Sequence, residues 1–562
     1  MANLVKHAQG ELKEILLAAL GRAVAAGELP AEPMPAFAIE IPADTTHGDF
    51  ATNAAMVSAR AFKLPPKKIA EIICNNCVLQ GTSFERYEIA GPGFINFFLS
   101  SAWFAKTLIA VFDEKENYGR TNYGRGQKAM VEFVSANPTG PMHMGNARGG
   151  ALGDCLASAL AFAGYDVTRE FYVNDAGNQI EKFANSLSAR YLQLYKKDIE
   201  FPEDGYQGDD IKERAREFAD MHGESFVNAD DETRKKALVD YALPKNVEKL
   251  KNDLSKYRID YDVWFFESTL HRSGAIKKVV DILTQNGYTY EKDDALWYKA
   301  TAFGADKDDV LIRANGIPTY FAADIAYHYN KFVDRGFDKV INVWGADHHG
   351  HVGRLKGAMT AVDIDSDKLD IVLMQLVRLV RGGEVVRMSK RTGKAITLND
   401  LLDDVPVDAA RFFFNLREPN SHFDFDLDLA VEQSAQNPVY YVQYAHARIC
   451  SIFKNLGAEG VIPRACTAEE LAALSTRDEM EVIRLLARLP DEVTEAAKNY
   501  DPARLTRYCV DLATQFHKFY NAHRVKGEDE PLMQARLALC AAVKIVLGNV
   551  LALLKITAPE AM

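Results

Sequence analysis

The sequence predicts an α/β protein built around a doubly wound parallel sheet, with an α+β domain before it and an all-α region after it. Strand-like and helix-like runs alternate from Ala129 to about Arg387, and that order implies parallel strands joined by helical crossovers. After Leu398 the apolar pattern is helical throughout. A chain of 562 residues is also too long for one core, so about three domains are expected.

The first domain is expected at residues 1–115. Its opening run carries charges among apolar residues and lacks a small-residue cleavage site, which indicates an amphipathic helix and not a signal peptide. A strand-like FAIEIP follows, then helices from Gly48 and Pro65, and the run FERYEIAGPGFINFFLS reads as a strand pair. The polar, Gly-rich stretch 114–128 is typical of a linker.

The second domain is expected at residues 116–398. Its strands are predicted at 128–134, 166–173, 339–345 and 371–380, and a charged helical stretch at about 179–257 is interpreted as an insertion. The loops SANPTGPMHMGN and GADHHGH both follow strands. Because ligands of such sheets bind beyond the carboxyl ends of the strands, both loops should meet at one edge. A helical third domain is expected at 399–562.

Bulk composition restricts the class of protein. Hydrophobic residues make up 48% and charged residues 26%, as in soluble globular proteins, and we expect no apolar run of about 20 residues that could span a bilayer. The net charge of −12 argues against indiscriminate nucleic-acid binding, although a local basic surface remains compatible with it. Seven scattered cysteines suit a reducing cytoplasm, and the lone pair Cys74 and Cys77 is interpreted as two half-buried thiols in preference to a zinc site.

Residues 143–146, His-Met-Gly-Asn, stand between a predicted strand and a predicted helix. The start of a helix presents unpaired N–H groups and the positive end of its dipole, an arrangement that binds phosphate. His143 would donate to a phosphate, and Gly145 would allow close approach of a base or of backbone. Taken alone, His143 would more often be a capping or surface histidine.

Residues 387–390, Arg-Met-Ser-Lys, form the second short motif. Lys390, flanked by Arg387 and Arg391 and followed by Gly393, would supply mobile positive charge to a departing pyrophosphate. The two motifs together predict an ATP site on the parallel sheet.

A degenerate HIGH segment and a KMSKS-like segment on one doubly wound domain resemble the class I aminoacyl-tRNA synthetases. Longer words resemble the arginyl-tRNA synthetases of the bacterial type over essentially the whole chain: VEFVSANPTGPMHMGNARG at 131–149, NDAGNQ at 174–179, YDVWFFES at 261–268, TYFAADIAYH at 319–328 and NPVYYVQYAHARI at 437–449. The resemblance implies L-arginine, ATP and tRNA(Arg) as substrates and arginyl-adenylate as intermediate. It also implies that tRNA binds before arginine is activated, that residues 1–115 bind tRNA and that 399–562 form an anticodon-binding bundle.

The resemblance implies roles for the ATP site. His143, Gly145 and Asn146 of the first motif, with Met388, Ser389 and Lys390 of the second, would form the catalytic set, and Arg387 would assist in binding ATP. Gly345 would pack against adenine and Asp347 would lie near the ribose, although Asp347 could equally be a helix cap. Asn146 replaces the usual second histidine and cannot become a cation. Mg²⁺ would accompany ATP, held by phosphates and water, and no tightly bound protein metal is expected.

Arginine recognition requires acceptors for a planar cation with five donors. The resemblance implies that Glu132, Ser135, Asn137, Tyr320, Asp324 and His348 bind arginine. Tyr320 and Asp324 are one helical turn apart and can face one pocket. Without the resemblance, Glu132 would be a solvated strand residue and Asp324 an exposed helix acid. His348 stands where some relatives have glutamine, so its contact with arginine is left open.

Contacts with tRNA are expected at two places. Tyr440, Tyr444 and Arg448 fall on one helical segment and suit unstacked anticodon bases, but tyrosines there can also pack a bundle. Phe94 and Asn96 alternate on one strand face and could hold a splayed base, although a purely structural strand is as good an interpretation.

The family is commonly monomeric, and no membrane partner is expected. Two rival hypotheses remain: a cysteine-type synthetase, which would need zinc ligands in the catalytic domain, and a catalytically silent tRNA-binding paralogue. The retained His143 and Lys390 count against the paralogue.

Overall fold

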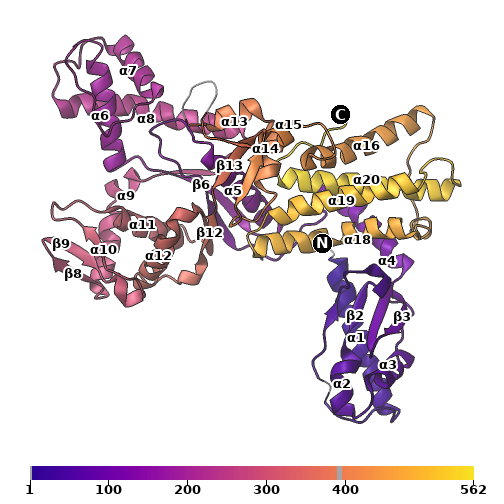
Figure 1. Ribbon diagram of the computed structural model, residues 1–562. Coiled ribbons are helices and arrows are strands. Elements are labelled where there is room, and N and C mark those ends of the chain that lie inside the picture. The colour runs from indigo at the N-terminus through magenta and orange to yellow at the C-terminus, as the bar shows by residue number, and fades with distance from the viewer. Residues whose placement is uncertain (1–2, 34, 389–394) are drawn as a thin grey trace.

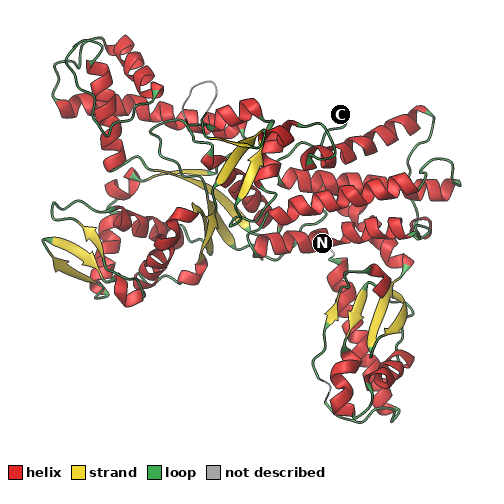
Figure 2. Ribbon diagram, in the orientation of Figure 1, coloured by secondary structure: helices red, strands yellow, loops and turns green. Residues whose placement is uncertain are grey.

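The computed structural model describes residues 3–33, 35–388 and 395–562. Figure 1 shows a central α/β body with two lobes on one side and a helical bundle on the other, and an N-terminal unit projecting from the bundle. Figure 2 shows strands gathered at the centre of the molecule, in the projecting unit and in one of the lobes.

The central sheet is parallel throughout and has the strand order β12-β11-β5-β6-β7. Its strands are β5 (Lys128–Glu132), β6 (Asp166–Val173), β7 (Val263–Phe266), β11 (Lys339–Gly345) and β12 (Leu369–Met374). The chain moves outward in one direction from β5 to β7 and in the other from β11 to β12. The crevice between β5 and β11 is therefore a topological switch point, where such sheets bind ligands.

Helices cover both faces of this sheet, which confirms the doubly wound prediction. Ala129 and Val131 of β5 join the core that contains α5 (Gly145–Phe162), whereas Met130 joins the core of the opposite face. That second core is built from α10 (Ala275–Gln285), α11 (Tyr320–Tyr329) and α12 (His349–Ala361). Successive residues of a strand point to opposite faces, so a strand covered on both sides is apolar along its whole length.

Helix α5 carries the first motif at its start and is buried along most of its length. Its glycines permit close packing on the sheet: a Cβ at Gly153 would lie 2.2 Å from Cγ of Phe133. A helix that is apolar on all sides is stable only inside a core, and this packing fixes where its first turn lies.

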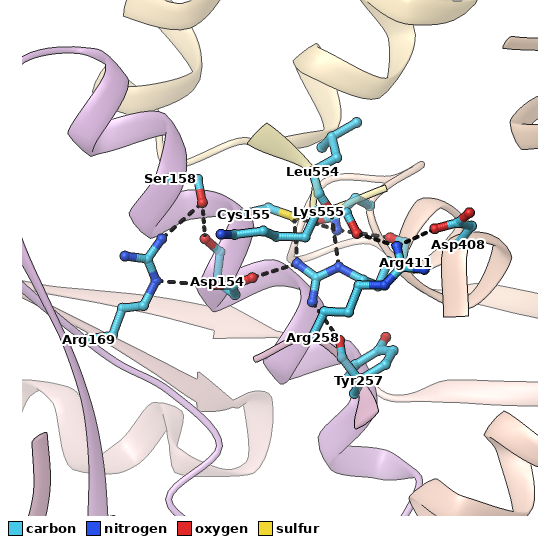
Figure 3. A network of polar contacts seen from close by, with 11 residues as sticks. Asp154, Cys155, Ser158, Arg169, Tyr257, Arg258, Asp408, Arg411, Leu554 and Lys555 are labelled. Atoms are coloured by element: carbon cyan, nitrogen blue, oxygen red, sulfur yellow. Dashed lines mark hydrogen bonds and ion pairs between the residues drawn. The ribbon is translucent and has the colours of Figure 1, made fainter. Parts of the chain in front are cut away.

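A buried polar network anchors α5 to distant parts of the chain (Figure 3). The fully buried Arg411, on α14 (Val407–Phe414), donates to Asp154 Oδ2 of α5 at 2.6 Å and to the carbonyl oxygens of Leu554 (2.9 Å) and Tyr257 (3.0 Å). Arg169 of β6 donates to the other oxygen of Asp154 at 2.9 Å. The network joins the motif-bearing helix to the end of the C-terminal bundle.

The predicted strand at 371–380 is wrong as a single element. The chain leaves the central sheet after β12, and β13 (Val377–Arg381) joins a separate sheet with β14 (Glu384–Val386) and β15 (Phe423–Asp426). The strand β15 also corrects the expectation that the chain is helical throughout after Leu398. Its four residues lie between helices, too short a run for the pattern to separate from a loop.

The charged stretch interpreted as an insertion forms three helices, α6 (Asn178–Leu192), α7 (Asp209–His222) and α8 (Asp231–Lys256), which make the upper lobe of Figure 1. This lobe has a small core of its own, centred on Phe183, Leu187, Tyr191, Phe218 and Leu238. The second lobe contains α9 (Ser268–Arg272), α10 to α12 and an antiparallel sheet of β8 (Thr289–Lys292), β9 (Ala295–Tyr298) and β10 (Asp309–Ile312).

The N-terminal unit packs α1 (Leu4–Ala25), α2 (Ala54–Phe62) and α3 (Pro66–Asn75) with an antiparallel sheet of order β1-β2-β4-β3, and α4 (Ser101–Glu114) follows it. The strands are β1 (Ile39–Glu40), β2 (Phe50–Thr52), β3 (Phe84–Ala90) and β4 (Phe94–Leu99). The strand pair is confirmed, but the helix expected from Gly48 begins only at Ala54. Gly48 has φ +87° and lies against β4, where a Cβ would be 2.8 Å from Phe97 O.

The C-terminal region consists mainly of helices: α13 (Leu398–Asp404), α14, α15 (Leu427–Val431), α16 (Pro438–Ala458), α17 (Ala468–Leu471), α18 (Arg477–Lys498), α19 (Ala503–Ala522) and α20 (Glu530–Leu553). The expectation that no segment could span a bilayer is wrong for α20. Its 24 residues are long and apolar enough by length and composition, with a mean hydropathy of 1.9 in the most apolar window. More than half of that window, 56%, is buried within the protein.

Cys74 is buried at the end of α3 and Cys77 is half-buried just beyond it. Burial raises the pKa of Cys74 to about 12 and that of Cys77 to about 11, so both are protonated thiols at neutral pH.

Candidate active site

A cavity of about 900 Å³ opens at the carboxyl ends of β5, β6 and β11. It brings together residues that the sequence places far apart, and its lining includes every described residue predicted for the ATP and arginine sites except Arg387 and Met388. The predicted residues on its wall are Glu132, Ser135, Asn137, His143, Gly145, Asn146, Tyr320, Asp324, Gly345, Asp347 and His348.

His143 lies exposed at the start of α5, with its ring held by the next turn of backbone. The Gly145 N–H donates to His143 Nδ1 at 3.0 Å, so in the neutral ring the proton is on Nε2. Among the described residues that N–H has no hydrogen-bond partner, so it can donate to a phosphate oxygen in the cavity. Gly145 permits this arrangement, because a Cβ there would lie 3.0 Å from Nδ1.

The chain that follows the second motif is attached to the first motif through backbone. His143 and Thr397 form an antiparallel bridge, with Met144 N donating to Ile396 O (2.9 Å) and Leu398 N to Met142 O (2.8 Å). The predicted residues Ser389 and Lys390 lie outside the described residues. Arg387 and Met388 are exposed and do not line the cavity. The structure therefore places beside His143 only residues 396–398, which follow the second motif.

Arg148 is a buried cation near the start of α5 that sequence reasoning missed. Its guanidinium donates to three backbone carbonyls, of Gln375 (2.7 Å), Glu418 (2.9 Å) and Ser421 (3.0 Å), and burial lowers its pKa to about 10. It therefore fixes the first turns of α5 to the chain that leaves β12 and to the chain that approaches β15.

A strained turn follows β5. Ser135 N donates to Phe133 O at 3.0 Å across Val134, which makes a three-residue γ-turn, and Val134 and Ser135 both have positive φ, +69° and +44°. Such backbone is unfavourable for a β-branched residue and is concentrated at functional sites. The turn directs the Ser135 hydroxyl back to Glu132 Oε1, to which it donates at 2.9 Å.

Glu132 is buried, with 7% of its surface exposed, so the interpretation as a solvated strand residue does not hold. Its second carboxylate oxygen, Oε2, accepts from Nζ of the fully buried Lys331 at 2.6 Å. Both oxygens of Glu132 therefore already have a partner from the protein.

Tyr320 and Asp324 both face the cavity from α11, as their spacing predicts. Asp324 Oδ2 accepts from His351 Nε2 at 3.0 Å, and Arg354 donates to the other ring nitrogen of His351 at 3.1 Å. Because Arg354 can only donate, the His351 proton on Nε2 is directed at Asp324.

A second buried acid stands behind Tyr320 and Asp324. Glu267 accepts from the Tyr172 hydroxyl at 2.8 Å, and burial raises the pKa of Glu267, with the charge of Asp324 adding to the effect. With its amide nitrogen directed at Glu267, Asn174 donates to Oε2 at 3.0 Å and its amide oxygen accepts from the Tyr320 hydroxyl. This network holds Tyr320 at the cavity wall.

The end of the cavity at Asp347 and His348 is more open. Asp347 and His348 have 80% and 59% of their side chains exposed, with 3.7 Å between Asp347 Oδ2 and His348 Nε2. The His348 ring lies near Trp344, with 6.0 Å between ring centres, at the outer edge of the cavity. Within the described ranges, no group of three or more His, Cys, Asp or Glu side chains is arranged to hold a metal ion.

Three family models match the chain in succession: the arginyl-tRNA synthetase N-terminal domain at residues 10–99, the catalytic domain of class I (R) tRNA synthetases at 107–451, and the DALR anticodon-binding domain at 442–562. The catalytic model alone spans more than half of the chain. The chain belongs to the arginyl-tRNA synthetase family.

Individual arginyl-tRNA synthetases agree with that assignment. The chain is 58% identical over 562 residues to the arginine–tRNA ligase of Caldanaerobacter subterraneus, and the alignment spans all of both chains. It is 55% identical over 564 residues to that of Ruminiclostridium cellulolyticum, again over both whole chains. The solved Thermus thermophilus arginyl-tRNA synthetase has the same fold, with a TM-score of 0.72 and 23% identity over 97% of this chain and 99% of that one.

The residues predicted to contact the anticodon lie on one face of α16. Tyr440 and Tyr444 stack with 6.3 Å between ring centres, Tyr444 stacks on His517 at 5.8 Å, and Arg448 lies over the Tyr520 ring at 4.5 Å. A second cavity of about 600 Å³ begins at Arg448. The structure agrees in part with both interpretations. The side chains pack on α19, as in a helical bundle, but Tyr444 is still 41% exposed, as contact with an anticodon base would need.

Phe94 and Asn96 do not share an open face in the way the alternation predicted. Phe94 is 38% exposed, but Asn96 is only 5% exposed. Strand β4 is an inner strand, and Asn96 is paired with Ala51 on one side and Glu88 on the other while the Gly48 loop covers it.

Several residues of the site were missed by sequence reasoning: Arg148, Tyr172, Asn174, Glu267, Lys331, His351 and Arg354. Arg148, Asn174 and Glu267 lie inside the segments that carry the family resemblance, which was a usable signal. Lys331 had no such signal, because its burial depends on a local change of helix geometry.

Proposed function

We propose that this protein is an arginine–tRNA ligase that activates L-arginine with ATP and transfers it to the 3′ end of tRNA(Arg). The observation that carries the proposal is one cavity with a phosphate-directed histidine at one end, His143, and a carboxylate at the other, Asp324. Membership of the arginyl-tRNA synthetase family supports the same activity.

In the first step an oxygen of the arginine carboxylate attacks the α-phosphorus of ATP, and the bond from that phosphorus to the pyrophosphate oxygen breaks. Both reactants are anions, so the enzyme must position them and neutralise charge. The His143 Nε2–H and the start of α5 provide donors at the phosphates. Asn146 adds a neutral donor only, so more of the cationic work is assigned to the loop 387–391, with Ser389 and Lys390.

In the second step the terminal ribose hydroxyl of tRNA(Arg) attacks the arginyl carbonyl, and AMP leaves. Gly345 against adenine and Asp347 at the ribose would hold the nucleotide through both steps. Mg²⁺ would enter with ATP, held by its phosphates and water. The protein would act in the cytoplasm as a monomer without a membrane partner.

Arginine is selected by polar groups at the inner end of the cavity. Asp324 would accept from the guanidinium, with Tyr320, Ser135 and Asn137 at the rest of the substrate and His348 at the edge. A polar site left unmatched by lysine or citrulline would reject both by roughly 10⁴-fold, so an editing domain is unnecessary.

Transfer RNA would contact all three proposed domains. Residues 1–115 would hold a splayed base at the exposed Phe94, and 399–562 would hold the anticodon at Tyr440, Tyr444 and Arg448. The domain at 116–398, with its insertion at 179–257, would receive the 3′ end.

The decisive assay is amino-acid-dependent pyrophosphate exchange, measured with and without tRNA(Arg). Exchange with arginine, dependent on tRNA, is expected. Exchange with cysteine would favour the cysteine-type enzyme, and tRNA binding without exchange for any amino acid would identify a silent paralogue. Either result would refute the proposal.

Replacing His143 with alanine should lower the rate of arginine activation by at least tenfold and leave tRNA affinity nearly unchanged, because the contact is to phosphate in the transition state. The measurement is single-turnover adenylate formation beside filter binding of tRNA(Arg). His422→Ala, at an exposed histidine outside the cavity lining, is the control. A parallel loss of tRNA affinity would mean that His143 has a structural role.

A further inference from the structure

Lys331 is a fully buried lysine beside the arginine end of the cavity. It lies in η4 (Asn330–Asp334), a π-helical turn that follows α11 directly. A π-turn is rare and occurs mostly at functional sites, where one extra residue per turn changes which side chains face a neighbour. Here it turns Lys331 toward the central sheet.

The Lys331 ammonium makes two hydrogen bonds, to Glu132 Oε2 at 2.6 Å and to Asn342 Oδ1 at 3.2 Å, and lies 4.0 Å from the centre of the Tyr327 ring. Its carboxylate partner is on the cavity wall. A buried lysine is stable only with such partners, so the pair forms a unit with no net charge.

The hydrogen bonds continue from Asn342 to the backbone of Asp324. Asn342 donates to His328 Nε2 at 2.8 Å, and His328 Nδ1 donates to Asp324 O at 2.8 Å. Burial first, and then the charge of Lys331, hold the pKa of His328 well below its usual value, so the ring is neutral and the direction of every bond is fixed. Lys331 is thereby bonded directly to the Glu132 carboxylate and linked through Asn342 and His328 to the backbone of Asp324.

The neighbouring strand β6 also carries a buried acid that is paired with a cation. Glu170 of β6 is in register with Glu132 of β5, and two adjacent buried carboxylates would repel each other. Glu170 is paired with Arg335 at 2.5 Å, just after the same π-turn. The π-turn and the residue that follows it therefore supply a cation to each of these two strand acids.

Asp324 differs from both strand acids. Within the described residues its side-chain partner is His351, which donates through Nε2 and accepts from Arg354 at its other ring nitrogen. Oδ1 accepts no hydrogen bond within that part of the chain, and the side chain remains 26% exposed in the cavity. Of the other acids that line the cavity, Asp309 is paired with Arg354 at 3.2 Å and Asp347 lies at the open edge. At the end formed by Glu132 and Asp324, Asp324 is therefore the acid that leaves one oxygen without a hydrogen bond from the described residues.

We propose that Lys331 is a specificity-determining positioning residue: it neutralises Glu132, so that Asp324 alone is the counter-ion of the substrate guanidinium. Glu132 still has lone pairs for a hydrogen bond from the substrate, but its charge is already matched. The end of the cavity at Glu132 and Asp324 then presents one uncompensated charge to a single planar cation. The inference rests on the proposed function and concerns which carboxylate carries the charge.

Removing Glu132 and Lys331 together tests whether Lys331 neutralises Glu132. Glu132→Gln alone leaves Lys331 positive and unpaired, and it should raise the KM for arginine by about 100-fold. In the double variant Glu132→Gln/Lys331→Met no charge remains, and the KM should return to within about tenfold of the unmodified enzyme. The measurements are tRNA-dependent pyrophosphate exchange, separating KM from kcat, and calorimetric binding of arginine to the protein with tRNA(Arg).

A double variant whose arginine KM rises by more than about tenfold would overturn the proposal, because Glu132 would then be a counter-ion itself. The comparison of the double variant with the unmodified enzyme tests the proposal even if the Glu132→Gln variant does not fold. The matched control is Asp370→Asn/Lys339→Met, which removes an ion pair at the opposite end of the same sheet and should leave the KM unchanged. Failure of the proposed function is seen separately, as no exchange by the unmodified protein.

Discussion

Replacing Asp324 with asparagine should raise the KM for arginine by about 100-fold or more, equivalent to about 3 kcal/mol, because one partner of a desolvated charge pair is lost. Asparagine keeps the shape, and its amide oxygen can still accept from His351. The KM for ATP should remain unchanged, since Asp324 lies at the end of the cavity that we propose binds arginine. Steady-state pyrophosphate exchange with each substrate varied in turn measures both values.

Asp306→Asn is the matched control for this substitution. Asp306 is exposed on the same part of the chain and is not in the cavity lining, so the same change of charge is made outside the site. Its arginine KM should be unaltered. An unchanged KM in Asp324→Asn would remove Asp324 from the substrate pocket, and an equal rise for ATP would indicate general distortion.

Replacing Arg411 with methionine should lower the free energy of unfolding by about 3–5 kcal/mol, because it breaks a buried ion pair and leaves its partners unpaired. Asp154, with 2% of its side chain exposed, would keep only Arg169, and the carbonyl oxygens of Leu554 and Tyr257 would lose a buried donor. Urea denaturation followed by circular dichroism measures the change.

Arg169→Met provides the comparison, because it removes the other partner of the same carboxylate. The Arg169 side chain is 19% exposed and makes its remaining hydrogen bond to Ser158, so a smaller loss of about 1–2 kcal/mol is expected. Equal losses for the two variants would contradict the view that the fully buried guanidinium of Arg411 is the main anchor of α5.

The fold could be predicted where one local unit determines the structure. The run 128–162 contains a strand, a turn and a helix in immediate succession, and both elements appear where the pattern indicates them. The break between β12 and β13 was not predictable, since an apolar run looks the same whether it continues in one sheet or enters another. The burial of α20 also depends on its packing partners and not on its own composition.

The site could be predicted in its outline and not in its charges. The loop with His143 follows a parallel strand, which predicted its place at the ligand-binding edge. The family resemblance placed Tyr320 and Asp324 in the same site, and their spacing of one helical turn predicted that both face it. The pairing of Glu132 with Lys331 depends on a π-turn, which no residue pattern signals. Asn96 was misjudged because alternation shows which residues share a face but not whether another segment covers that face.

The buried network around Asp154 also has a consequence for synthesis on the ribosome. Asp154 meets its first partner, Arg169, 15 residues later, but Arg411 follows only after 257 residues and the Leu554 carbonyl a further 143 after that. At about 5–20 residues per second, these intervals last on the order of ten seconds or more. The nascent helix must therefore hold its carboxylate with Arg169 alone during that time, and its final anchor forms only once the bundle has been made.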